Sequence, residues 1–150
     1  MGLKEKLQSD LTDAIRSQDA VKSGTIRMLL AAITNEEVAG KSAKVLSDAE
    51  IITVLSREAK KRREAAEAFA DAGRADKAAL EKSEGEVIAK YLPEQMSEDE
   101  IIKLIDAAIA QTGASGPADM GKVMGVIKSQ VAGKADGGTV SGLVKAALNK

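Results

Sequence analysis

The chain has 150 residues, 44% hydrophobic and 30% charged, which is enough for one ordinary domain or two small helical ones. Lys and Arg number 22 against 23 Asp and Glu, so a net charge of −1 provides no overall basic field to attract nucleic acid. Cys and His are absent, which excludes a disulfide framework, thiol and imidazole catalysis, and the usual zinc, haem and iron–sulfur ligands.

Apolar residues recur at helical spacing from the start of the chain, and the first two predicted elements are amphipathic helices. The first is expected to end near residues 17–19, and its apolar stripe consists of Leu3, Leu7, Leu11 and Ile15. The second is expected to fade out at Gly40, and its apolar residues are Ile26, Leu29, Leu30 and Ile33.

The third predicted helix begins at about residue 48, because Ser47 and Glu50 have the spacing of a capping box. It continues through Phe69 to a stop at residues 72–73, where an alanine is followed by a glycine. A fourth helix begins at about Arg74, and we expect it to bury Leu80, Val87, Ile88 and Tyr91.

The clearest break in the helical pattern is the Leu-Pro-Glu-Gln-Met segment at residues 92–96, because proline interrupts a helix. Ser97 and Glu100 then form a second capping-box pattern, and three shorter apolar segments follow, separated by loops rich in Gly and Ser. No segment alternates with period two for long enough to be a strand. We therefore predict an all-α protein, with a helical N-terminal domain of about four helices at residues 1–92 and a compact three-helix tail domain at residues 93–150.

Charge is unevenly distributed along the chain. Residues 1–92 hold 16 basic and 16 acidic side chains, whereas residues 93–118 hold one Lys against five acids. Residues 119–150 hold five Lys against two Asp, which makes the last two predicted helices locally +3. The tail candidates for contact with RNA phosphates are Lys122, Lys128, Lys134 and Lys145.

The other basic concentration is the run 57–63, with five cations in seven residues. It has two interpretations. Its charges form a solvated helix face and pair with Glu58, Glu64 and Glu67 one turn away, or they form an anion-binding surface. The candidate RNA contacts of this part of the chain are Arg57, Lys60, Lys61, Arg63 and Arg74.

Residues 116–122 have the G-x-x-x-x-G-K spacing of a phosphate-binding loop. However, Val123 stands where Ser or Thr would hold magnesium, Asp119 adds a negative charge, and the preceding segment is predicted to be helical. We interpret this segment as a helix start, in which Asp119 favours the N-terminus and Gly121 and Gly125 let another helix approach closely.

No catalytic constellation is apparent. Carboxylate pairs such as Glu36 with Glu37 and Glu81 with Glu84 are interpreted as structural or solvated, because no His is available to complete a di-metal helical bundle. The Ser and Thr residues have no identifiable base. No signal peptide or membrane-spanning run is visible, so we expect a cytoplasmic protein with no metal, no cofactor and no membrane partner.

Several longer motifs occur in a fixed order along the chain. They are RMLLAAITNE at 27–36, REAKKRR at 57–63, AGRAD at 72–76, YLPEQ at 91–95, DMGKVM at 119–124 and GKADG at 133–137. In these motifs the chain resembles the GatB/YqeY family, specifically its stand-alone YqeY-like members, and the resemblance covers essentially the whole chain. The YLPEQ and DMGKVM motifs are the most specific.

The resemblance implies a relation to the carboxy-terminal helical and tail region of the B subunit of the tRNA-dependent amidotransferase. That enzyme amidates Glu-tRNA(Gln) or Asp-tRNA(Asn) with glutamine as nitrogen donor, and the matching region of the family contacts tRNA. By the motif match, the resemblance points to Lys122 and Lys134, whereas Lys128 and Lys145 are added from charge and helix placement only. Gly24 and Gly85 depart from the pattern, since better helix formers are expected there.

Three functions follow as hypotheses. The leading one is a non-catalytic tRNA-associated accessory protein of translation that binds the phosphate backbone and shape of tRNA, because one Phe and one Tyr leave little for base stacking. The second is a protein-interaction module that docks on an amidotransferase or an aminoacyl-tRNA synthetase. The third is carbon–nitrogen ligase activity with glutamine as amido-N-donor, which the family association suggests. The sequence offers no ATP site and no amidase nucleophile for it, so we expect the isolated chain to be inactive.

Overall fold

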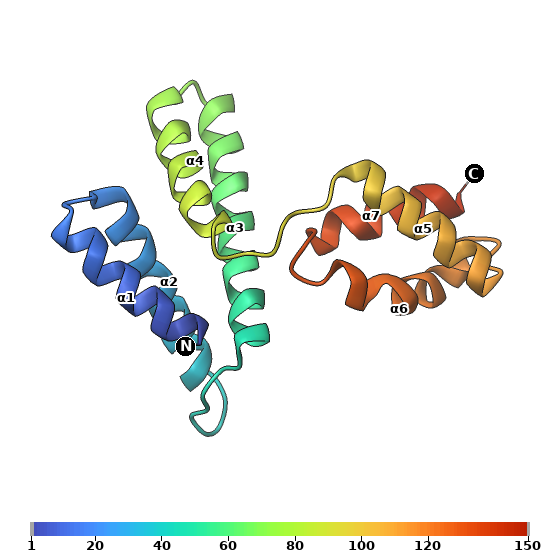
Figure 1. Cartoon of the computed structure of the whole chain (residues 1–150). Helices are drawn as coiled ribbons and strands as arrows, with labels where there is room; N and C mark the ends of the chain where they lie inside the picture. Colours follow the sequence, from blue (N-terminus) through green and yellow to red (C-terminus); the bar gives the residue numbers. More distant parts are fainter. Residues whose placement is uncertain (1, 150) are drawn as a thin grey trace. The chain divides into compact units, whose positions relative to one another are not determined.

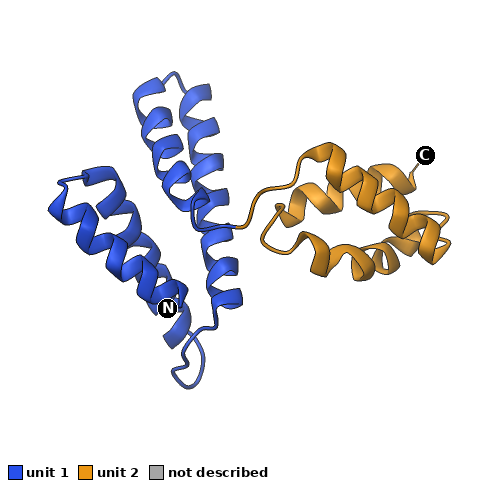
Figure 2. Ribbon diagram, in the orientation of Figure 1, with its two compact units in different colours: residues 1–92 blue, residues 93–150 orange. Residues whose placement is uncertain are grey.

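The computed structural model describes residues 2–149, and these fold into seven α-helices, one short 3-10 helix and no strand (Figure 1). The all-α prediction is thereby confirmed. Contacts divide the chain into two compact units, Met1–Leu92 and Pro93–Lys150 (Figure 2).

The first unit contains α1 (Leu3–Arg16), α2 (Ala20–Val38), α3 (Asp48–Asp71) and α4 (Ala75–Ala89). In Figure 1, α1 lies along α2, and α4 runs beside the second half of the long helix α3. All four helices contribute to one apolar core, with fully buried members that include Leu7, Ile26, Leu55 and Ile88.

The predicted signals for the two ends of α3 are present. Ser47 Oγ accepts a hydrogen bond from the backbone N–H of Glu50 at 3.2 Å, and Glu50 Oε2 accepts one from the N–H of Ser47 at 2.8 Å. This reciprocal pair is a complete capping box. At the other end, Gly73 has a φ of +75°, a left-handed conformation that glycine adopts without the steric penalty of a Cβ.

Two apolar side chains lie outside the core to which their spacing had assigned them. Ile15 is 49% exposed, and Ala14 is buried in its place. Each step of four residues turns about 40° beyond a full turn of the helix, so residues spaced by four drift around the helix axis and away from the core. A step of seven residues ends only about 20° short of two full turns, which places Ala14 on the same face of α1 as Leu7. Leu80 is 48% exposed because it lies about 160° around α4 from Ala78, the residue that packs inward.

Arg62 connects α3 to α4 through carboxylates. Its Nη1 lies 3.3 Å from Oε2 of Glu84 and 3.5 Å from Oε2 of Glu81, and its Nη2 lies 3.8 Å from Oε2 of Glu58. A Cβ on Gly85 would lie 3.9 Å from Cβ of Arg62, so the two helices are in ordinary contact here. Arg62 is therefore a structural cation of the α3–α4 pair.

The second unit contains α5 (Glu98–Thr112), the 3-10 helix η1 (Pro117–Asp119), α6 (Met120–Val131) and α7 (Gly137–Leu148). Its three α-helices surround one buried apolar cluster, made of Ile101, Ile105, Ala108, Val123, Ile127, Val131, Val140, Val144 and Leu148. None of the helices in residues 2–149 is long and apolar enough to cross a membrane. The same residues contain no group of three or more His, Cys, Asp or Glu that could hold a metal ion.

Candidate nucleic-acid interface

Four of the five candidate cations of the first unit lie next to carboxylates of the same unit. Arg57 Nη2 lies 3.0 Å from Oε2 of Glu36 on α2, and Lys61 Nζ lies 3.0 Å from Oε1 of Glu58. Lys60 Nζ lies 4.0 Å from Glu64, Arg74 Nε lies 3.6 Å from Asp76, and Arg63 makes an interaction of its own. This is the arrangement of a solvated helix face whose charges are compensated locally.

Three of the candidate lysines in the second unit lack such compensation. Lys128 on α6, Lys134 in the loop before α7 and Lys145 on α7 are exposed, and none of them forms an ion pair within residues 2–149. Lys122 is an intermediate case, since its Nζ lies 3.4 Å from Oδ1 of Asp119 while 67% of its side chain remains exposed. Among the predicted RNA contacts, the cations without an ion pair within residues 2–149 therefore lie in the last two helices and the loop between them, although other exposed cations, such as Arg27 and Lys82 in the first unit, are unpaired as well.

The GKADG motif forms the loop between α6 and α7, and its residues have different structural roles. Gly133 has a φ of +73°, in the left-handed region that favours glycine. Asp136 caps α7, because its Oδ2 accepts hydrogen bonds from the N–H of Thr139 at 3.0 Å and from Thr139 Oγ1 at 3.1 Å. Lys134 is different, since its side chain makes no hydrogen bond or ion pair within residues 2–149.

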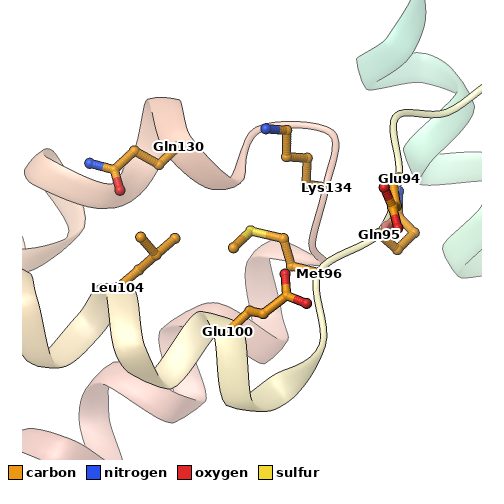
Figure 3. A pocket seen from close by; sticks show the side chains of 7 residues that line it. All are labelled: Glu94, Gln95, Met96, Glu100, Leu104, Gln130 and Lys134. Carbon is orange, nitrogen blue, oxygen red and sulfur yellow. The ribbon is translucent and has the colours of Figure 1, made fainter.

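Lys134 lies at a groove of about 570 Å³ in the second unit (Figure 3). The groove is lined by Glu94, Gln95, Met96, Glu100, Leu104, Gln130 and Lys134. The segment before α5 forms part of it and is hydrogen-bonded to the loop, because the N–H of Met96 donates to the carbonyl oxygen of Lys134 at 2.9 Å. The exposed Lys134 ammonium thus lies at the edge of a groove whose other charged groups are the carboxylates of Glu94 and Glu100.

Residues 116–122 have the geometry of a helix start rather than of a phosphate-binding loop. The element before them is α5, not a strand, and η1 lies within the segment. Asp119 Oδ2 accepts a hydrogen bond from the N–H of Ser115 at 3.0 Å, and this bond, followed by the nearby charge of Lys122, holds the pKa of Asp119 below its ordinary value. The resulting carboxylate would repel a phosphate at this position.

The interpretation of Gly121 and Gly125 as residues that admit another helix is wrong for the described chain. Both glycines are exposed, and a Cβ at either position would meet nothing within 4 Å. Each glycine in a helix interior is about 1 kcal/mol less favourable than alanine. Packing within residues 2–149 gives no reason for glycine rather than alanine at these two positions.

An internal repeat, which the sequence analysis missed, accounts for the register of these glycines. Residues 121–128 are GKVMGVIK and residues 138–145 are GTVSGLVK, so Gly, Val, Gly and Lys recur in the same order and spacing on α6 and α7. Val123 and Val140 are both fully buried, whereas Gly125 and Gly142 are both exposed. The signal that could have revealed the repeat is this self-similarity at a constant offset.

Known proteins are similar to this chain along most of its length. The family described as Yqey-like protein matches residues 4–148. A Schizosaccharomyces pombe protein described as uncharacterized is 33% identical over 63% of this chain and 76% of its own. Altered inheritance of mitochondria protein 41, mitochondrial, of Pyrenophora tritici-repentis is 31% identical over 84% of this chain and 69% of its own. The protein of that name from Candida glabrata is 32% identical over 59% and 48%, respectively.

Proposed function

The chain belongs to the YqeY-like protein family, and we propose that it is a non-catalytic accessory protein that binds tRNA through backbone phosphates and shape. The resemblance to the carboxy-terminal region of the amidotransferase B subunit supports tRNA as the ligand and translation as the process. The proposed contacts in the tail are Lys122, Lys128, Lys134 and Lys145.

The observation that carries the proposal is the contrast between the two sets of candidate RNA contacts. Arg57 and Lys61 on α3 have carboxylates at 3.0 Å, whereas Lys128, Lys134 and Lys145 have no ion-pair partner within residues 2–149. An exposed cation of the second kind neutralises an external phosphate and releases its counterion without first breaking an internal ion pair. We therefore assign a secondary contribution to the first unit, through Arg57, Lys60, Lys61, Arg63 and Arg74.

The repeat supports the same surface. On each of α6 and α7, an exposed glycine precedes an exposed lysine by three residues, as Gly125 precedes Lys128 and Gly142 precedes Lys145. Glycine allows a ligand to approach the helix backbone more closely than any other residue does. In the proposal, the RNA backbone approaches each helix along its glycine face, and the lysine one turn further on contacts a phosphate.

Base stacking has little part in this mode of binding. Phe69 and Tyr91 are the only aromatic residues of the chain, both lie in the first unit, and Tyr91 donates a hydrogen bond to Asp10. Recognition through phosphates and shape is therefore proposed, with weak and salt-sensitive affinity. The proposed compartment is the cytoplasm, although fungal relatives carry the word mitochondrial in their names.

The proposal is tested by fluorescence anisotropy of labelled total tRNA titrated with the full chain at about 50 mM and about 200 mM salt. Three or four phosphate contacts predict a slope of about −2 to −4 in a plot of log affinity against log salt. Absence of binding at about 50 mM salt would overturn the RNA proposal. A capture of protein partners that survives nuclease treatment would then favour the interaction-module hypothesis.

A further inference from the structure

We infer that Gln95 is a positioning residue for the Lys134 cation, an inference that rests on the proposed function of the tail. Gln95 Nε2 donates hydrogen bonds to the carbonyl oxygen of Gly133 at 2.9 Å and to that of Pro93 at 2.8 Å. The neighbouring N–H of Met96 donates to the carbonyl oxygen of Lys134 at 2.9 Å. Both peptide groups that flank the α-carbon of Lys134 therefore accept hydrogen bonds from residues 95–96, and their N–H groups donate to the carbonyl oxygen of Val131 at 2.9 and 3.1 Å.

This restraint matters because the direction of the Lys134 side chain depends on the backbone alone. The Lys134 side chain makes no hydrogen bond or ion pair within residues 2–149. The preceding residue is Gly133, which has a left-handed φ of +73° and, as a glycine, the widest range of accessible backbone conformations. Fixing the two peptide groups fixes the direction in which the Cα–Cβ bond leaves the loop. A side chain held in this way loses less conformational entropy when it binds a phosphate.

The first two residues of the YLPEQ motif have structural roles in the first unit, whereas Gln95 has no comparable role in the core. Tyr91 donates a hydrogen bond to Asp10, and Leu92 packs against the core of the first unit. Gln95 is exposed, and water could satisfy the carbonyl of Gly133 in its absence. We therefore assign to the Gln95 bond a share in ordering the Lys134 loop, beside the bonds to the Val131 carbonyl and from the Met96 N–H.

The test compares Gln95→Met with the matched control Gln130→Met. Both changes replace an amide by an apolar group of similar length at the same groove and leave the net charge unaltered. However, Gln130 Nε2 makes only a 3.5 Å contact, with the carbonyl of Val126. Anisotropy with total tRNA measures affinity for each variant in the wild-type and Lys134→Ala backgrounds. We expect Gln95→Met to weaken binding about threefold in the first background and to have no effect in the second, as coupled residues do.

A second readout needs no RNA. The ¹H–¹⁵N heteronuclear NOE of Lys134 and Ala135 reports motion on the ps–ns timescale, and we expect it to fall in Gln95→Met but not in Gln130→Met. An unchanged NOE in Gln95→Met, unchanged tRNA affinity in that variant, or a loss of affinity that persists in the Lys134→Ala background would each overturn the positioning role. If the wild-type chain binds no tRNA, the proposed function fails and the positioning role fails with it. The NOE then shows separately whether the hydrogen bond orders the loop.

Discussion

Gly125 of α6 and Gly142 of α7 occupy the same position in two copies of one helical pattern, and a Cβ on either residue would meet nothing within 4 Å. Both helices therefore carry a helix-weakening residue at an exposed position where a side chain would have no neighbour within residues 2–149. This shared register places each glycine three residues before Lys128 or Lys145, and the proposal assigns both glycines to the RNA surface.

The double substitution Gly125→Ala with Gly142→Ala is expected to separate stability from binding. Each alanine raises the free energy of unfolding by up to about 1 kcal/mol, because it favours the helix and meets no neighbour. The added methyl groups hold the RNA backbone away, so tRNA affinity is expected to fall. Thermal unfolding and anisotropy measure the two effects. Gly24→Ala on α2, where a Cβ also meets nothing within 4 Å, is the matched control that gains stability without changing affinity. Unchanged affinity in the double variant would show that the glycine faces are not in contact with RNA.

Removal of single tail lysines is expected to change the salt dependence of tRNA binding. Substitution of Lys128, Lys134 or Lys145 by alanine should in each case reduce the magnitude of the negative slope of log affinity against log salt by about 0.7 to 0.9, because one phosphate contact is lost. Lys61→Ala is the matched control on α3, since the Lys61 ammonium lies 3.0 Å from Glu58 and is already compensated. Titrations at four or more salt concentrations give the slopes. A larger loss for Lys61→Ala than for the tail variants would move the interface to the first unit.

Tyr91→Phe is expected to destabilise the first unit by about 1 kcal/mol. The Tyr91 hydroxyl donates to Oδ2 of Asp10, and burial, together with this bond, raises the pKa of Tyr91 well above its ordinary value. Phenylalanine keeps the ring, over which the Lys6 ammonium lies 5.6 Å from the centroid, and removes only the donor. Amide hydrogen exchange should accelerate in α1 and α4, with α5 of the second unit as the internal reference. Equal acceleration in α5 would contradict a local role for this hydrogen bond.

Glu37 is expected to make the stability of the first unit depend on pH. Its Oε1 accepts a hydrogen bond from Lys4 Nζ at 2.7 Å, and its Oε2 accepts one from the N–H of Leu46 at 3.3 Å. The bond from Lys4 is the main cause of a pKa of Glu37 below the ordinary value, and it outweighs the opposing effect of burial.

Because the pKa of Glu37 is lower in the folded state than in the unfolded state, the carboxylate stabilises the fold above about pH 4.3. This contribution is lost as pH falls through the folded-state pKa. Glu37→Gln should therefore be less stable than the wild type at pH 7, and the difference should narrow as the pH falls below about 4.3 and through the folded-state pKa. Urea unfolding followed by circular dichroism at each pH measures the difference. A gap that stays constant between pH 7 and pH 3 would exclude an effect of Glu37 ionisation.

Local sequence signals were sufficient for much of the fold. The Ser47–Glu50 capping box and the glycine after α3 act within one helical turn, so their effect on helix ends is predictable without knowledge of the tertiary structure. The all-α class followed from helical periodicity, and membership of the YqeY-like family followed from the ordered motifs. The local excess of lysine in the last two helices is likewise a property of the sequence.

Other features depend on which helix lies opposite a given side chain. Ile15 and Leu80 are apolar but exposed, because no helix within residues 2–149 covers their positions on α1 and α4. Arg57 is paired with Glu36, which lies 21 positions away on another helix, so the pair cannot be predicted from the residues next to Arg57 in the sequence. Local charge patterns reveal where cations gather along a chain. Only the packing of helices and the hydrogen bonds between distant segments decide which cations are paired and which, like Lys134, have no partner within residues 2–149.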